Sequence, residues 1–151
     1  IALNATIHTN NRKIDANKFF KGMFETSLKS SEIIEAIEFD IPQKSSYQKL
    51  PNPASRYAIV GVYVAKHKTG INVGVTGAKS CVYNDKDLSG ALTNNFSSSA
   101  IDNVKVSTSG MNSDMVISLS ERFELNHSMS DSFLAALITR TILSSFVSKI
   151  P

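Results

Sequence analysis

The stretch YAIVGVYVAKH, at residues 57–67, decides how this chain folds. It is rich in β-branched residues and apolar at consecutive positions, which is typical of a strand covered on both faces. Thr69 and Gly70 follow with turn chemistry, and residues 71–75 (INVGV) return to a strand pattern. The sequence therefore predicts a central strand over residues 57–67 and an antiparallel partner over residues 71–75.

Shorter strand patterns precede this pair. Residues 1–7 alternate apolar and polar positions, residues 8–11 have turn chemistry, and residues 12–14 are expected to return as the second arm of a hairpin. Residues 37–41 alternate until Pro42 ends the predicted strand, and residues 47–50 form a further short candidate. Because the chain opens inside a hairpin, we expect it to be a fragment that has lost its amino-terminal part.

Helical patterns are concentrated in the second half of the chain. Asp15 is expected to cap one early turn over residues 17–20, and residues 85–96 are predicted to form a helix despite Gly90 in its middle. Residues 104–113 read as loop, and the clearest helix begins at Ser130 or Asp131 and extends to residue 146. Strands followed by helices predict an α+β fold, with helices packed on one side of a small antiparallel sheet.

Composition narrows the classes of protein that fit. The chain has 151 residues, enough for one core, and a net charge of +3 whose cations are spread singly except at residues 66–68. This pattern argues against nucleic-acid binding. The longest apolar run, residues 57–65, is about half of what a membrane-spanning helix needs, so no transmembrane segment is expected. A lone cysteine, Cys81, and the lack of a secretory signal predict a cytoplasmic protein.

No local motif predicts catalysis or metal binding. The segment GVTGAKS at residues 74–80 has two residues between its glycines where a phosphate-binding loop has four, so it reads as a strand leaving its sheet through a glycine turn. The three histidines lack metal-ligand spacing, and no G-x-S-x-G elbow occurs. Glu32, Glu35 and Glu38 are expected to point largely to solvent. The predicted sets of catalytic residues and metal ligands are therefore empty.

An ordered set of segments nevertheless resembles one family. Residues 19–33 (FFKGMFETSLKSSEI), followed by an isoleucine-rich stretch to Pro42, resemble the FFxGxxxTxLxxxEI segment of the FAD-binding medium subunits of molybdenum hydroxylases. This group includes aerobic carbon monoxide dehydrogenases and xanthine dehydrogenases. The likeness continues through residues 46–50, 54–62, 75–78 and 110–114, and then residues 115–129 fit the family poorly.

The resemblance implies a layout and two cofactor-binding residues. Residues 1–42 would end the second FAD-binding subdomain, and residues 45–151 would form the carbon monoxide dehydrogenase flavoprotein C-terminal domain, a small antiparallel sheet flanked by about three helices. FAD would be bound mainly by upstream glycine-rich segments that are not in this chain. Ile34 would pack near the isoalloxazine and Lys49 would lie beside the flavin, while strand core for Ile34 and a solvated surface position for Lys49 stay open as alternatives.

The same resemblance implies a role in electron transfer. Electrons would pass from a molybdopterin large subunit through a 2Fe-2S small subunit to FAD and on to an external acceptor, in a dimer of heterotrimers. This chain alone would be inactive. The alternative is a non-catalytic interaction or assembly domain that has the same fold and no cofactor. Neither the substrate nor the electron acceptor is indicated by these residues.

Overall fold

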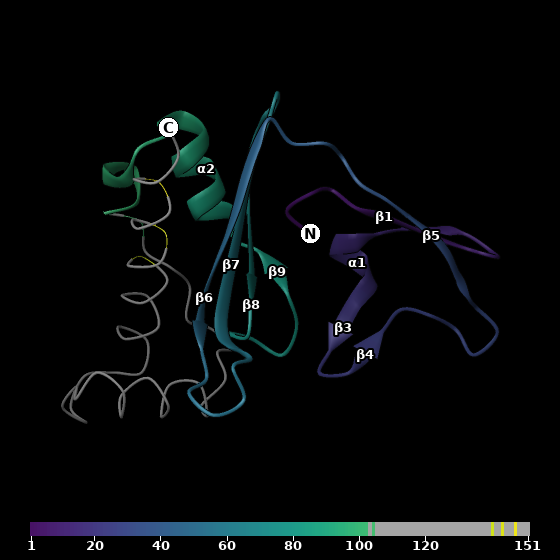
Figure 1. The fold of residues 1–151 in the computed structure, drawn as a ribbon. Coiled ribbons are helices and arrows are strands. Elements are labelled where there is room, and N and C mark those ends of the chain that lie inside the picture. Colours follow the sequence, from purple (N-terminus) through teal and green to yellow (C-terminus); the bar gives the residue numbers. More distant parts are fainter. Residues whose placement is uncertain (103, 105–139, 141–142, 144–146, 148–151) are drawn as a thin grey trace.

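The computed structural model describes residues 1–102, 104, 140, 143 and 147, and within them the strands form three antiparallel sheets (Figure 1). Their strand orders are β2-β1-β5, β3-β4 and β6-β7-β8-β9. The strands are β1 (Thr6–Thr9), β2 (Lys13–Asp15), β3 (Phe20–Gly22), β4 (Glu25–Thr26), β5 (Ile34–Glu38), β6 (Lys44–Pro51), β7 (Ala58–His67), β8 (Gly70–Thr76) and β9 (Tyr83–Asn84). The helices are α1 (Ala16–Phe19), α2 (Lys86–Asn94) and the 3-10 helix η1 (Ser98–Ile101).

The four-stranded sheet confirms the predicted central strand and its partner. β7 lies between β6 and β8, with Tyr63 opposite Tyr47 on one side and opposite Gly74 on the other. β6 is longer than the 47–50 segment predicted, because its polar start pairs along the edge of the sheet, where the backbone ladder needs no apolar side chains. β9 adds a short fourth strand beside β8.

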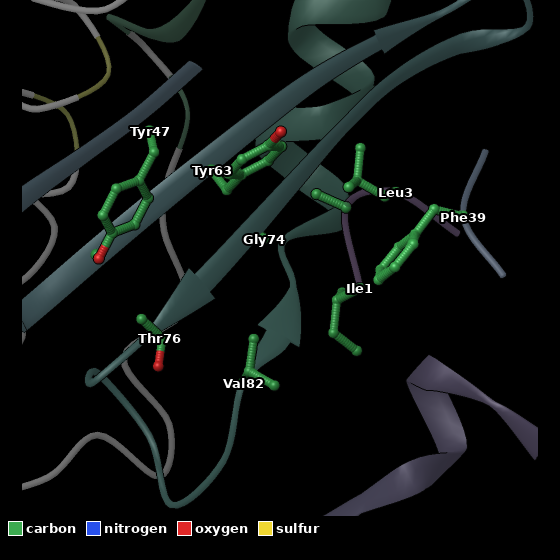
Figure 2. A pocket seen from close by; sticks show the side chains of 10 residues that line it. Ile1, Leu3, Phe39, Tyr47, Tyr63, Gly74, Thr76 and Val82 are labelled. Atoms are coloured by element: carbon green, nitrogen blue, oxygen red, sulfur yellow. The ribbon is translucent and has the colours of Figure 1, made fainter. Parts of the chain in front are cut away.

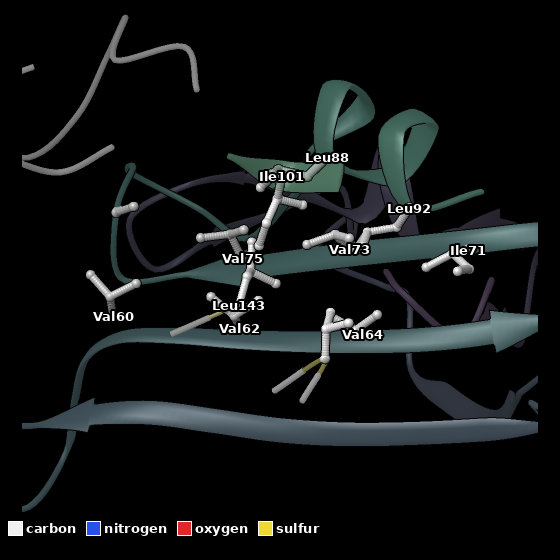
Figure 3. Packing of buried hydrophobic residues seen from close by; sticks show 12 residues of the cluster. Val60, Val62, Val64, Ile71, Val73, Val75, Leu88, Leu92, Ile101 and Leu143 are labelled. Atoms are coloured by element: carbon white, nitrogen blue, oxygen red, sulfur yellow. The ribbon is translucent and has the colours of Figure 1, made fainter. Parts of the chain in front are cut away.

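One face of this sheet carries the main hydrophobic core. Alternate residues of β7 and β8 point toward α2, whose Leu88 and Leu92 are fully buried against them (Figure 3). The cluster comprises Val60, Val62, Val64, Ile71, Val73, Val75, Ala78, Leu88, Leu92, Ile101, Leu143 and Val147. The predicted helix over residues 85–96 is confirmed as α2, and the buried Asp85 caps it by accepting the Leu88 N–H at 3.0 Å.

The last part of the chain is described only at isolated positions. Arg140, Leu143 and Val147 are helical, and Leu143 is fully buried in the main core. The rest of the helix predicted over residues 130–146 lies outside the described residues. So does the predicted loop over residues 104–113, apart from Val104, which is partly buried against the same core. The expected number of about three flanking helices is therefore not tested.

A glycine turn ends β8, as the sequence predicted for residues 74–80. The strand stops at Thr76, and Gly77 follows with φ +83°, in the left-handed region that favours glycine. A Cβ at Gly77 would collide with the carbonyl oxygen of Ile59, because the backbone of the neighbouring strand passes directly against it. The segment is a close crossing of two backbones and not a phosphate loop.

The N-terminal sheet confirms the predicted hairpin but not the start of its first strand. β1 and β2 pair with Ile7 opposite Ile14, and Asp15 caps α1 by accepting the Asn17 N–H at 2.7 Å. Residues 1–5, predicted as strand, instead form turn and irregular chain, with Asn4 at φ +50°. Burial in this segment does not follow the predicted alternation: Ala2 and Ala5 are buried, and the Ala2 carbonyl oxygen accepts a hydrogen bond from Asn72 Nδ2 of the four-stranded sheet at 3.2 Å.

Two further segments of the N-terminal half differ from the sequence-based prediction. The strand expected over residues 37–41 is β5, at Ile34–Glu38, since it is the preceding residues that align with β1. The β3-β4 hairpin was not predicted, because its strands are only three and two residues long. Among the described residues, no helix is long and apolar enough to cross a membrane.

Candidate functional site

Ile34, one of the two predicted cofactor-binding residues, begins β5 and pairs with Thr9 of β1. Its side chain is 40% exposed, so it is not strand core. Ile33 and Ile37 beside it are 69% and 49% exposed. The structure therefore presents a group of isoleucines on the surface of the N-terminal sheet, where an apolar ligand or protein surface could contact them.

Glu32, directly before these isoleucines, is buried, and the expectation that it points to solvent is wrong. Its carboxylate accepts hydrogen bonds from Arg12 Nε at 2.6 Å and Arg12 Nη2 at 3.0 Å, and from the Lys29 N–H at 2.9 Å. The hydrogen bonds from Arg12, followed by the one from the Lys29 backbone, lower the pKa of Glu32 to about 2. Sequence pattern alone missed this pair because its partners are twenty residues apart.

Lys49, the other predicted cofactor-binding residue, is exposed on β6, and its ammonium has a defined partner. Lys49 Nζ donates to the carbonyl oxygen of Arg56 at 2.9 Å. Arg56 has φ +63°, and its N–H donates to the Asn52 carbonyl oxygen at 2.9 Å, which closes the loop between β6 and β7. The accepting carbonyl belongs to this closed loop, so the Lys49 ammonium lies at the end of the sheet, beside the β6-β7 connection.

A pocket of about 180 Å³ opens on the face of the four-stranded sheet opposite α2. Figure 2 shows Tyr47 and Tyr63 on neighbouring strands, with the N-terminal segment and Phe39 across from them. The pocket is lined by Ile1, Ala2, Leu3, Phe39, Tyr47, Gly61, Tyr63, Gly74, Thr76 and Val82. The Tyr47 side chain packs over Gly61, where there is room because glycine has no Cβ. A Cβ at that position would be 2.5 Å from the Tyr47 hydroxyl oxygen.

The structure does not bring the two predicted residues together in this pocket. Ile34 and Lys49 belong to different sheets, and neither lines the pocket. Lys49 is nonetheless opposite Gly61 in the β6-β7 ladder and two residues from Tyr47, so its strand forms the edge of the pocket. The pocket escaped sequence reasoning because its residues come from six separate segments that only the tertiary fold assembles.

The residues that the resemblance assigns to the flavin have suitable side-chain chemistry, but they lie on different sheets. The exposed isoleucines at residues 33, 34 and 37 offer an apolar surface that would suit the ring of a flavin, and Lys49, on the other sheet, offers an ammonium that would suit a polar edge. The glycine turn at Gly77 is filled by the neighbouring backbone, so it provides no phosphate cradle. No group of three or more His, Cys, Asp or Glu side chains that could hold a metal occurs in the described part of the chain.

Comparisons with known proteins give likeness in structure alone. No protein-family model and no curated protein matches the sequence. Reconstituted CO dehydrogenase from Oligotropha carboxidovorans matches with a TM-score of 0.64 at 15% identity, over 99% of this chain and 55% of that chain. Quinoline 2-oxidoreductase from Pseudomonas putida 86 matches with a TM-score of 0.62 at 15% identity, over 97% of this chain and 53% of that chain. The chain thus spans about half the length of these solved chains, and it shares their fold.

Proposed function

We propose that this chain is the C-terminal portion of the FAD-binding subunit of a molybdenum hydroxylase. The observation that carries the proposal is the match of 99% of the chain to a CO dehydrogenase structure. It agrees with the independent resemblance of residues 19–42, 46–50 and 54–62 to the flavoprotein subunits of that family. An oxidoreductase role also suits the second neighbour, a quinoline 2-oxidoreductase.

In this proposal the chain divides as the resemblance implies. Residues 1–42 end the second FAD-binding subdomain, and residues 45–151 form the C-terminal domain. The solved CO dehydrogenase chain extends well beyond the matched 55%, which leaves room for the segments that would bind most of FAD. The partners would be a molybdopterin large subunit and a 2Fe-2S small subunit in a cytoplasmic dimer of heterotrimers.

The residues of this chain would act on the flavin by contact and charge. FAD, when bound, supplies a carrier that receives electrons from an iron–sulfur cluster and releases them to an acceptor. The Lys49 ammonium, fixed by the Arg56 carbonyl, would stabilise negative charge that develops on reduction. Ile34, exposed at the start of β5, would pack on the ring and exclude water from it. Neither residue would donate or abstract a proton.

The competing proposal is a non-catalytic assembly domain, and one experiment separates the two. The complete subunit that contains this chain is co-expressed with the products of its neighbouring genes and purified through a tag on the subunit. We expect a complex that keeps stoichiometric FAD through gel filtration. A well-folded complex with the same partners and no flavin would support the assembly domain instead.

A further inference from the structure

The segment that leads to Ile34 is tied to the turn of the β1-β2 hairpin by side chains. Asn10 brackets the backbone of Ile33: its N–H donates to the Ile33 carbonyl at 3.1 Å, and its Oδ1 accepts the Ile33 N–H at 3.0 Å. Asn10 Nδ2 also donates to the Ser31 carbonyl at 3.3 Å. The backbone just before Ile34 is therefore held in one conformation by a residue of the opposite turn.

Arg12 fixes the same segment from its other end. Its Nη2 donates to the Ser27 carbonyl at 2.7 Å as well as to Glu32, while its Nε donates to the other oxygen of the Glu32 carboxylate. The Glu32 side chain is 1% exposed and that of Arg12 is 41% exposed. A forked guanidinium thus joins the start and the end of the 27–32 segment through charged, directional contacts.

The ion pair between Arg12 and the buried Glu32 requires desolvation of a charged carboxylate. Ion pairs with a buried member contribute little net stability, because desolvation offsets their attraction, and their best-attested value is to specify one arrangement of the chain. Here the arrangement specified places Ile33 and Ile34 on the surface, where they bury little area of their own. The Arg12–Glu32 pair therefore fixes a segment whose apolar side chains point outward, as a preorganised contact surface requires.

We propose that Arg12 and Glu32 form a positioning pair that sets the place of Ile34 against the flavin ring and thereby the relative affinity for oxidised and reduced flavin. This inference rests on the function proposed above. With the pair intact, Ile34 packs closely and keeps water from the ring. When the pair is broken, the segment loosens and water reaches the ring, which favours the charged, reduced form over the neutral, oxidised form.

The test compares two carboxylates of the same sheet in the complete, FAD-containing subunit. Glu32→Gln removes the charge from the positioning pair. Glu38→Gln is the matched control, since Glu38 lies in β5 and contacts His8 Nε2 at 2.9 Å but is 70% exposed. The measured quantities are the two-electron midpoint potential of the flavin, the Kd of FAD and the Tm. If Glu32→Gln does not fold, Arg12→Lys keeps a positive charge and loses only the forked contact.

We expect Glu32→Gln to change the ratio of affinities for reduced and oxidised flavin about tenfold in favour of the reduced form, a rise in potential of about 30 mV. Glu38→Gln should leave the potential unchanged. An unchanged potential and Kd in the Glu32 variant, together with a lowered Tm, would make the pair purely structural and overturn the inference while the proposed function stands. Absence of FAD from the wild-type subunit would overturn both.

Discussion

Gly77 illustrates how single residues constrain this fold. Its φ of +83° is unfavourable for any residue with a Cβ, and such a Cβ would meet the Ile59 carbonyl oxygen. Gly90 is the opposite case, because it lies within α2 and a Cβ there would have nothing within 4 Å. Substitution by alanine is therefore expected to change the stability of the protein in opposite directions at the two glycines.

Gly77→Ala should destabilise the protein by roughly 2–4 kcal/mol, from backbone strain and the collision. Gly90→Ala should stabilise it by about 0.5–1 kcal/mol, since alanine favours a helix interior over glycine. Urea unfolding followed by circular dichroism measures both. Equal and small changes in the free energy of unfolding for both variants would show that Gly77 is not packed as closely against the Ile59 carbonyl as the structure indicates.

Lys49 allows a test, at a single residue, of the proposed contact between this chain and the flavin. If its ammonium faces the flavin, Lys49→Met removes a charge-assisted contact worth roughly 1.5–3 kcal/mol in the reduced state, which lowers the two-electron potential by about 30–65 mV. The fold should be little affected, because the side chain is exposed. Lys86→Met, in α2 on the other face of the sheet, is the control. Potentiometric titration decides, and an unchanged potential with a lower Tm would assign Lys49 to structure.

At the scale of elements, the strands that could be predicted are those whose pattern reflects their surroundings directly. β7 and β8 were predicted because alternate residues pack on α2 while the others are covered by neighbouring chain, so most positions are apolar. The start of β1 was misplaced because Ile1, Leu3 and Ala5 alternate with other residues in the sequence, whereas the structure has irregular chain there and buries Ala2 and Ala5. The β3-β4 hairpin lacks any such pattern, since most of its residues are exposed.

The cap of α2 should matter more than that of α1. Asp85 is buried and accepts the Leu88 N–H at 3.0 Å at the start of a nine-residue helix that carries two core leucines. Asp15 caps a four-residue helix and is exposed. Asp85→Ala should cost about 1–2 kcal/mol of the free energy of unfolding, and Asp15→Ala a few tenths. Urea unfolding of the two variants measures both losses. A larger loss for Asp15→Ala than for Asp85→Ala would contradict the prediction.

The link between the 27–32 segment and the hairpin gives stability a pH dependence. The pKa of Glu32 falls from an ordinary 4.5 to about 2 in the folded chain. A depressed pKa contributes stability that is complete above the unfolded value and is lost as the pH falls from about 4.5 toward 2. The Tm of the wild type should therefore approach that of Glu32→Gln across this window. A Tm difference that stays constant from about pH 6 to pH 2 would show that the carboxylate gains nothing from Arg12.

Across the part of the molecule that the structure describes, the large exposed apolar side chains are concentrated in one stretch of the chain. Eight of the ten large hydrophobic residues exposed in the described structure lie between residues 20 and 41, whereas the four-stranded sheet covers its valines. They are Phe20, Met23, Phe24, Ile33, Ile34, Ile37, Phe39 and Ile41. In the proposed subunit, this surface would be covered by FAD and by the remaining protein.

The candidate site could be predicted from sequence only in part, for a physical reason. Ile34 and Lys49 were found by resemblance, since an exposed isoleucine and an exposed lysine have no pattern of their own. The Arg12–Glu32 pair and the Tyr47–Tyr63 pocket depend on which segments the fold brings together, over separations of 20 residues and more. The local sequence pattern indicates which residues are buried and whether a segment is a helix or a strand. It does not determine which distant segments come into contact.

The most direct test of the account is the flavin content of two purified proteins. One is the complete subunit, and the other consists of residues 1–151 alone. We expect the complete subunit to carry stoichiometric FAD after gel filtration and residues 1–151 to retain none, because in the proposed layout most of FAD would be bound by segments outside residues 1–151. A folded complete subunit without flavin would contradict the account.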